Sequence, residues 1–356
     1  MPRDLLAAVR SSASRPVLRA LLAAAPVRAW IARGRAAPIE GQVVDEALRV
    51  VLALDDVLHD GDPSGRTPAD ARARMLQSIP VVDTEPLPGV TTRDEALPGP
   101  DGIIPARLYV PPALETPAPG LVFFHGGGWV TGDLESHDRF CRRLAVRGAL
   151  RVVAVDYRLA PEHRYPAAVD DTLAAFRHVA SEAARFGIDP RRLGVGGDSA
   201  GGNLAAVVAR RTRGDGVQPA VTALIFPGLD ATRSSPSHAT FGERHLLTGA
   251  AIDWYLGHYL GDVAAHERDP DVSPLLASDA AGLGPHLITV AHFDPLRDEG
   301  EAYARKLGAA GARVKLVRRP TMIHGFIVMG GVSPAALAAT DALCSDIGAA
   351  LRGPRS

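Results

Sequence analysis

Short β-rich runs alternate with helix-forming runs along most of this chain, from about residue 90 onward. The β-rich runs are IPARLYV, GLVFFH, RVVAVDY, RRLGVGG, VTALIF, HLITVA and RVKLVRR, and the helical runs cover residues 136–147, 167–185, 202–211 and 299–308. Strands that alternate with helices form a mostly parallel sheet covered by helices on both faces. Ligands bind such sheets beyond the carboxyl ends of the strands, so the residues that follow each strand are the candidates for chemistry.

The N-terminal region is helical rather than alternating. One helical segment covers residues 45–58, and a second begins near Thr67, where Thr-Pro-Ala-Asp is a helix-start signature. Further upstream, within residues 15–35, one helical face gathers the apolar residues Leu18, Leu21, Leu22, Val27, Trp30 and Ile31. The simplest interpretation is a helix that packs on the protein or on a partner subunit. The alternatives are a helix on a membrane surface and a disordered segment.

Charge, cysteines and hydropathy argue against several classes of protein. The formal net charge is −1, which gives no electrostatic case for nucleic-acid binding. The two cysteines, Cys141 and Cys344, are far apart and lack metal-site spacing, so we expect neither a disulfide framework nor a zinc site. Arg19 and Arg28 interrupt the N-terminal apolar stretch, which argues against a secretory signal, and no apolar run is long enough to span a membrane. We therefore expect a cytoplasmic protein with no metal or nucleotide cofactor.

One predicted strand end carries a nucleophile signature. The sequence LGVGGDSAGGN contains Gly197-Asp198-Ser199-Ala200-Gly201, a G-x-S-x-G motif with an apolar strand before it and a helix-forming run after it. In this context the flanking glycines permit a tight strand-to-helix turn that lifts the serine hydroxyl above the sheet edge. The competing interpretation is a turn of small residues with no chemical role.

Another strand end carries three consecutive glycines. The stretch GLVFFHGGGW places His125 and then Gly126, Gly127 and Gly128 directly after an apolar strand. A serine that attacks a carbonyl generates an oxyanion, and backbone N–H groups aimed at that oxygen stabilise it. Glycine suits this task because a Cβ would block the acyl group and because such a loop often needs positive φ. The N–H group of Ala200 would supply a third donor.

A serine nucleophile needs a base, and the base needs an orienting acid. Among 12 histidines, His324 stands out because it lies in a loop after the strand-like run RVKLVRR and is followed by glycine. The acid should lie between serine and histidine in the chain, where HLITVAHFDPLRDEG offers Asp294 and Asp298. Asp294 comes first in the loop, whereas we expect Asp298 to be the N-cap of the helix at 299–308.

Five motifs in this order resemble the hormone-sensitive-lipase-like (family IV) carboxylesterases of the α/β-hydrolase fold. The matching pieces are HGGGW at 125–129, YRLAPEHRYPAAVDD at 157–171, GDSAGGN at 197–203, DPLRDEG at 294–300 and HGF at 324–326. The resemblance implies that Ser199 is the nucleophile, His324 the base and then the acid, and Asp294 the orienting carboxylate. It assigns the oxyanion donors to Gly127, Gly128 and Ala200, with Gly126 as an alternative.

The resemblance also implies an organisation of the chain. We expect an N-terminal helical extension at 1–38, cap helices at 39–88, and an α/β-hydrolase catalytic domain at 89–356 with a cap insertion at about 234–269. In that insertion, Trp254 and Tyr255 either line a substrate pocket or simply pack. His125 is expected to fix its loop by hydrogen bonding, and Arg158 and Glu162 are expected to form buried ion pairs.

The implied activity is hydrolysis of short- to medium-chain acyl esters without a cofactor. The partner is a small-molecule ester, with neither nucleic acid nor firm membrane association. Lactone or amide cleavage would use the same machinery and stays open as an alternative, as does a binding protein that has lost catalysis. Family members often dimerise through the last strands of the sheet, so a homodimer is also an open expectation.

Overall fold

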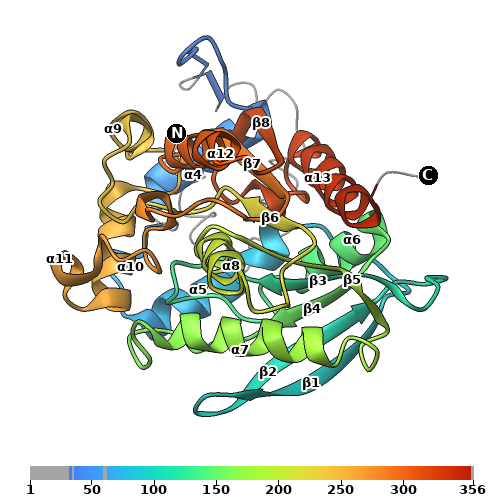
Figure 1. Cartoon of the computed structure of the whole chain (residues 1–356). Coiled ribbons are helices and arrows are strands. Elements are labelled where there is room, and N and C mark those ends of the chain that lie inside the picture. Colours follow the sequence, from blue (N-terminus) through green and yellow to red (C-terminus); the bar gives the residue numbers. More distant parts are fainter. Residues whose placement is uncertain (1–31, 34–35, 59–61, 354–356) are drawn as a thin grey trace.

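The computed structural model describes residues 32–33, 36–58 and 62–353. Eight strands form one sheet in the order β1-β2-β4-β3-β5-β6-β7-β8 (Figure 1). Their bounds are β1 Thr91–Gly99, β2 Gly102–Val110, β3 Ala118–Phe124, β4 Arg151–Val155, β5 Ile188–Asp198, β6 Thr222–Ile225, β7 His286–Phe293 and β8 Val314–Ile323. The β1–β2 and β2–β4 pairs are antiparallel, and every other pair is parallel. The carboxyl ends of the six parallel strands therefore lie along one edge of the sheet.

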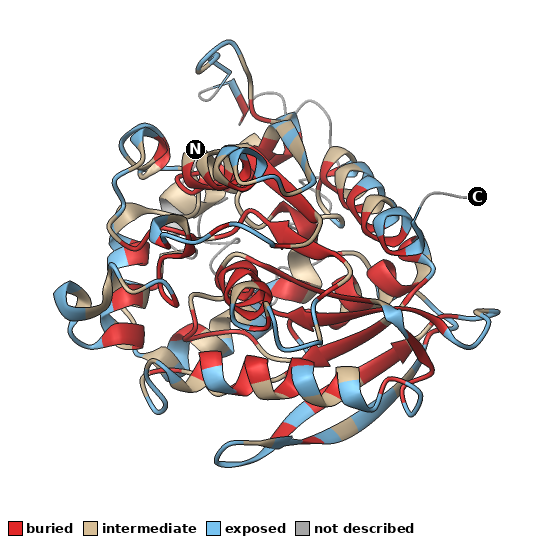
Figure 2. Ribbon diagram, viewed as in Figure 1, coloured by how far each residue is buried: buried red, intermediate tan, exposed pale blue. Residues whose placement is uncertain are grey.

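Both faces of the sheet are buried at its central parallel strands, as expected for such strands (Figure 2). Successive side chains of a strand point to opposite faces, so in β3 Val122 and Phe124 belong to one core and Leu121 and Phe123 to the other. The first core contains residues of α7 (Ala167–Ser181), α8 (Ala200–Arg211) and α12 (Arg297–Ala309). The second contains residues of α6 (Asp138–Gly148) and α13 (Pro334–Arg352). This three-layer arrangement holds the strand ends rigidly.

Two stretches far apart in the sequence supply the remaining helices. The first stretch forms α4 (Glu46–Leu58) and α5 (Pro68–Val82), and the second forms α9 (Pro236–Phe241), α10 (Gly249–Leu260) and α11 (Val263–His266). Short 3-10 turns cover η3 (Pro274–Leu276) and η4 (Phe326–Val328). The start of α5 is the predicted one, because the Thr67 hydroxyl accepts a hydrogen bond from the Asp70 N–H at 3.2 Å. We call these two helical stretches the cap segments.

The predicted architecture is present. The seven β-rich runs correspond to β2 through β8, and the four helical runs correspond to α6, α7, α8 and α12. The edge strand β1, the final helix α13, the short helices α9 and α11 and the two 3-10 turns were not predicted. The apolar face at 18–31 and nearly all of the proposed extension at 1–38 lie outside the described residues. In the part of the chain that the structure describes, no helix has both the length and the apolar character needed to cross a membrane.

Candidate active site

Ser199 occupies a strained turn between β5 and α8. Its backbone has φ 52° and ψ −117°, a region that residues other than glycine rarely adopt, and such strain costs on the order of 1–3 kcal/mol. The turn is held by its neighbours, since the Ser199 N–H donates to the Ile225 carbonyl at 2.9 Å and the Ser199 carbonyl accepts from the Gly228 N–H at 3.3 Å. Strain that is overdetermined in this way is typical of a functional residue.

The glycines on either side of Ser199 are explained by close backbone approach. A Cβ on Gly201 would overlap the carbonyl oxygen of Phe124, the last residue of β3. A Cβ on Gly197 would overlap the backbone of Gly201 and would also meet the Phe124 carbonyl oxygen at 2.5 Å. The glycines of the motif therefore let the helix that begins after Ser199 approach the strand that leads into the glycine loop.

Three strand ends bring Ser199, His324 and Asp294 together. His324 follows β8, and its Nε2 lies 3.1 Å from the Ser199 Oγ. Its Nδ1 lies 2.8 Å from Oδ2 of Asp294, a carboxylate that follows β7 and is fully buried. The second oxygen of Asp294 accepts the Leu296 N–H at 2.9 Å. A carboxylate only accepts, so the imidazole places its proton on Nδ1 and leaves Nε2 to accept from the serine hydroxyl.

Asp298 does not have the predicted position. Helix α12 begins at Arg297, so Asp298 lies in its first turn rather than at its N-cap. Its carboxylate accepts the Ser237 N–H at 2.9 Å and the Arg297 Nε–H at 2.8 Å. The expectation of an N-cap at Asp298 is therefore wrong, because the helix starts two residues earlier than the sequence pattern indicated.

Two amide groups of the glycine loop make no hydrogen bond, and the third is bonded to Asp198. The Gly126 N–H donates to Oδ1 of Asp198 at 2.9 Å. Gly127 and Gly128 have φ of 118° and 60°, in the region that favours glycine. Within the described residues, the N–H groups of Gly127, Gly128 and Ala200 donate no hydrogen bond. These three amides are therefore free to bind an oxygen atom, whereas that of Gly126 is committed.

His125 lies behind the loop and not beside the serine. Its Nδ1 donates to the Gly126 carbonyl at 2.8 Å, and its own carbonyl accepts from the Tyr157 hydroxyl at 2.8 Å. The Tyr157 ring stacks on the imidazole at 4.4 Å. Burial lowers the pKa of His125 to about 4, so the ring is neutral near pH 7. The predicted loop-fixing hydrogen bonds are present.

A cavity of about 860 Å³ adjoins the site. Ser199, His324 and the glycine loop line it from the sheet side, and residues of both cap segments line it from the other. Tyr255 is among the lining residues, whereas the Trp254 ring packs against Tyr255 and His258. Of the two aromatics, Tyr255 therefore lines the pocket, whereas Trp254 packs against its neighbours. In the described part of the chain, no group of histidine, cysteine or acidic side chains could hold a metal ion.

The two predicted ion pairs differ in burial. Arg158 pairs with Asp171, whose side chain is fully buried, at 2.8 Å, as expected. Glu162 instead pairs with Arg72 of α5 at 2.6 Å and is 54% exposed, so the expectation of a buried pair is wrong there. Arg72 also donates to the carbonyls of Val130 and Ala160 at 2.8 Å each. Sequence reasoning missed Arg72 because its partners lie far along the chain.

Comparisons with known proteins point to one family. A family model described as the alpha/beta hydrolase fold matches residues 121–328. The chain is 41% identical to the carboxylic ester hydrolase LipN of Mycobacterium tuberculosis, over 92% of this chain and 88% of that protein. It is also 41% identical to an ethyl acetate hydrolase of Pseudomonas putida, over 68% of this chain and 76% of that protein.

A solved structure is similar to this chain in both sequence and fold. The ester hydrolase EH1AB1 from the metagenome of Lake Arreo shares 38% identity and a TM-score of 0.82, covering 86% of this chain and 98% of that one. The sequence motifs, the sheet topology and these relatives lead to one conclusion. The chain belongs to the hormone-sensitive-lipase-like carboxylesterases of the α/β-hydrolase fold and is a carboxylic ester hydrolase.

Proposed function

We propose that Ser199, His324 and Asp294 form the catalytic triad of this esterase, and that the amides of Gly127, Gly128 and Ala200 form its oxyanion hole. The observation that carries the proposal is the single imidazole that bridges hydroxyl and carboxylate at 3.1 and 2.8 Å. Asp294 is the acid rather than Asp298, whose carboxylate bonds to Ser237 and Arg297.

The reaction follows from this geometry. The Ser199 Oγ forms a bond to the ester carbonyl carbon while its proton passes to Nε2 of His324. The carbonyl oxygen becomes an oxyanion and accepts from the three free amides. Collapse of this intermediate breaks the bond to the alkoxy oxygen, and Nε2 returns the proton to the leaving alcohol. Water then repeats the sequence on the acyl-enzyme, which releases the acid and restores the serine.

The substrate class is the short- to medium-chain acyl ester. A cavity of about 860 Å³ has the size of a site that surrounds a small organic molecule. One relative is named for ethyl acetate, a short-chain ester. We also assign a substrate-selecting cap to the cap segments, which correspond to the expected regions 39–88 and 234–269 and line the cavity opposite Ser199. Rates across an acyl-chain series of model esters, with a lactone and an anilide alongside, test this assignment.

Labelling and a pair of matched variants test the triad. A fluorophosphonate should modify Ser199 alone and abolish esterase activity, and peptide mass spectrometry locates the adduct. Asp294→Asn should lose on the order of 10⁴ in kcat. Asp298→Asn is the control, since it makes the same chemical change four residues away, and it should lose far less. A larger loss at Asp298, or an adduct on another residue, would reverse the assignment.

A further inference from the structure

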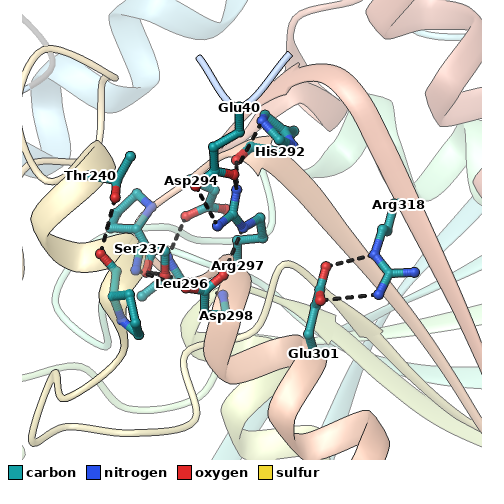
Figure 3. A network of polar contacts seen from close by, with 12 residues as sticks. Glu40, Ser237, Thr240, His292, Asp294, Leu296, Arg297, Asp298, Glu301 and Arg318 are labelled. Carbon is teal, nitrogen blue, oxygen red and sulfur yellow. Dashed lines mark hydrogen bonds and ion pairs between the residues drawn. The ribbon is translucent and has the colours of Figure 1, made fainter. Parts of the chain in front are cut away.

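The loop that carries Asp294 is bonded to the second cap segment through one residue, Ser237. The Ser237 hydroxyl donates to the Pro295 carbonyl at 2.6 Å and accepts from the Asp298 N–H at 3.2 Å. The Ser237 N–H donates to the Asp298 carboxylate at 2.9 Å. Figure 3 shows Ser237 facing the turn between Asp294 and α12. Three hydrogen bonds thus join one residue of α9 to the loop and to the first turn of α12.

Arg297 closes the other side of the same loop. Its guanidinium pairs with Glu40 at 2.5 Å and with Asp298 at 2.8 Å (Figure 3). It also lies over the Phe241 ring at 5.0 Å. The Arg297 side chain is only 12% exposed. The loop is therefore held between the segment that precedes the cap helices and the helix α9.

The bonds within the loop do not by themselves place it on the protein. The Leu296 N–H and the Arg297 N–H both bond to Asp294, to its carboxylate at 2.9 Å and to its carbonyl at 3.1 Å. These bonds orient the carboxylate relative to its own loop. Ser237 is the residue of α9 that hydrogen-bonds to this loop. It is fully buried and is not among the residues that line the cavity.

We propose that Ser237 is a positioning residue for Asp294, so that the cap insertion sets the geometry of the acid as well as covering the substrate. The inference rests on the proposed triad. Removal of the hydroxyl leaves the Pro295 carbonyl and the Asp298 N–H without their partner in a buried place, and buried polar groups that lose a partner move or incur a desolvation cost. Movement of the loop carries the Asp294 carboxylate away from His324, and a displacement of about 1 Å near a reacting group can cost about 10² in rate.

The first test is the ratio of kcat to KM effects in Ser237→Ala. We expect kcat to fall about ten- to hundredfold while KM for a model ester changes by less than about twofold, because Ser237 does not line the cavity. Thr240→Ala is the matched control. Thr240 is on the same helix, and its hydroxyl bonds at 3.3 Å to Pro236 within that helix and not to the loop. This control should keep the wild-type kcat.

The decisive test is a double-mutant cycle with Asp294→Asn. If Ser237 acts through the Asp294 carboxylate, Ser237→Ala should change kcat by less than about twofold in the Asp294→Asn background. Losses that multiply would overturn the proposal, as would a Ser237→Ala single variant with the kcat of Thr240→Ala. Wild-type rates in Asp294→Asn alone would instead refute the triad, so the two failures are distinct. If Ser237→Ala does not fold, Ser237→Cys keeps a weaker donor at the same position, and the same double-mutant cycle is measured with it.

Discussion

Gly128→Ala is the sharpest perturbation of the oxyanion loop. An alanine Cβ at this position would overlap the Tyr255 ring and lie 2.8 Å from the Tyr255 Cβ. Carbon atoms in contact prefer about 3.5–4.0 Å, so the loop or the ring must move by roughly 1 Å. The position also has φ 60°, where a residue with a Cβ costs about 1–2 kcal/mol.

The expected loss follows from that displacement. A shift of about 1 Å can cost 10² in rate, and complete removal of one oxyanion donor costs about 10²–10³. We therefore expect kcat of Gly128→Ala to fall by about 10²–10³. Gly311→Ala is the control, because Gly311 also has a positive φ, 88°, but a Cβ added there would meet nothing within 4 Å. It should lose stability and keep kcat.

A second substitution separates steric displacement from backbone strain. In Gly128→Ala/Tyr255→Ala the overlap with the ring is gone, whereas the strain at positive φ and the 2.8 Å approach to the Cβ of residue 255 remain. Compared with Tyr255→Ala alone, which corrects for the changed cavity wall, the double variant should recover part of the lost kcat. Steady-state kinetics on a model ester and thermal melting measure the two effects. A Gly128→Ala enzyme with wild-type kcat would refute the assignment of this amide, and an absence of rescue would refute the steric argument.

Two further predictions concern buried polar groups. Burial raises the pKa of Glu299, which pairs with His238, from 4.5 to about 7, so its contribution to stability is fully present below pH 4.5 and lost as the pH rises through 7. The free energy of unfolding of Glu299→Gln, relative to that of the wild type, should therefore rise by about 3 kcal/mol between pH 4.5 and 8. Denaturant melts measure both proteins, and the same pH dependence in the two would contradict this. Tyr157→Phe removes the hydrogen bond to the His125 carbonyl and should cost about 1–3 kcal/mol of stability; an unchanged melt would show that the bond contributes nothing.

Local patterns predicted much of this molecule, and long-range pairings account for what they missed. Seven strands and the positions of Ser199, Asp294 and His324 were readable because each depends on a short apolar run and the residues just after it. The edge strand β1 was not predicted because most of its residues are exposed and it lacks an apolar run. Helix α13 does have a readable start, since Ser333 caps it and Pro334 follows, and it could have been predicted.

The pairings that shape the site join residues far apart in the chain. The Asp198 carboxylate accepts a hydrogen bond from the Gly126 N–H, 72 residues away in the chain. The Asp298 carboxylate accepts one from the Ser237 N–H, 61 residues away. No periodicity or spacing signals such a bond, because it depends on how strands and cap segments are brought together. The sequence alone therefore left Gly126 as an alternative oxyanion donor and gave no sign of the bond between Ser237 and Asp298.

The contact between Gly201 and the Phe124 carbonyl has a consequence for redesign of the enzyme. It fixes the spacing between nucleophile and glycine loop through main-chain atoms alone, so this spacing does not depend on which side chains surround the bound ester. Helices α5 and α10 reach the cavity without taking part in that contact. Libraries aimed at bulkier esters should therefore vary these two helices and keep residues 197–201 constant. They should also leave Ser237 of α9 unchanged, because it bonds to the loop that carries Asp294.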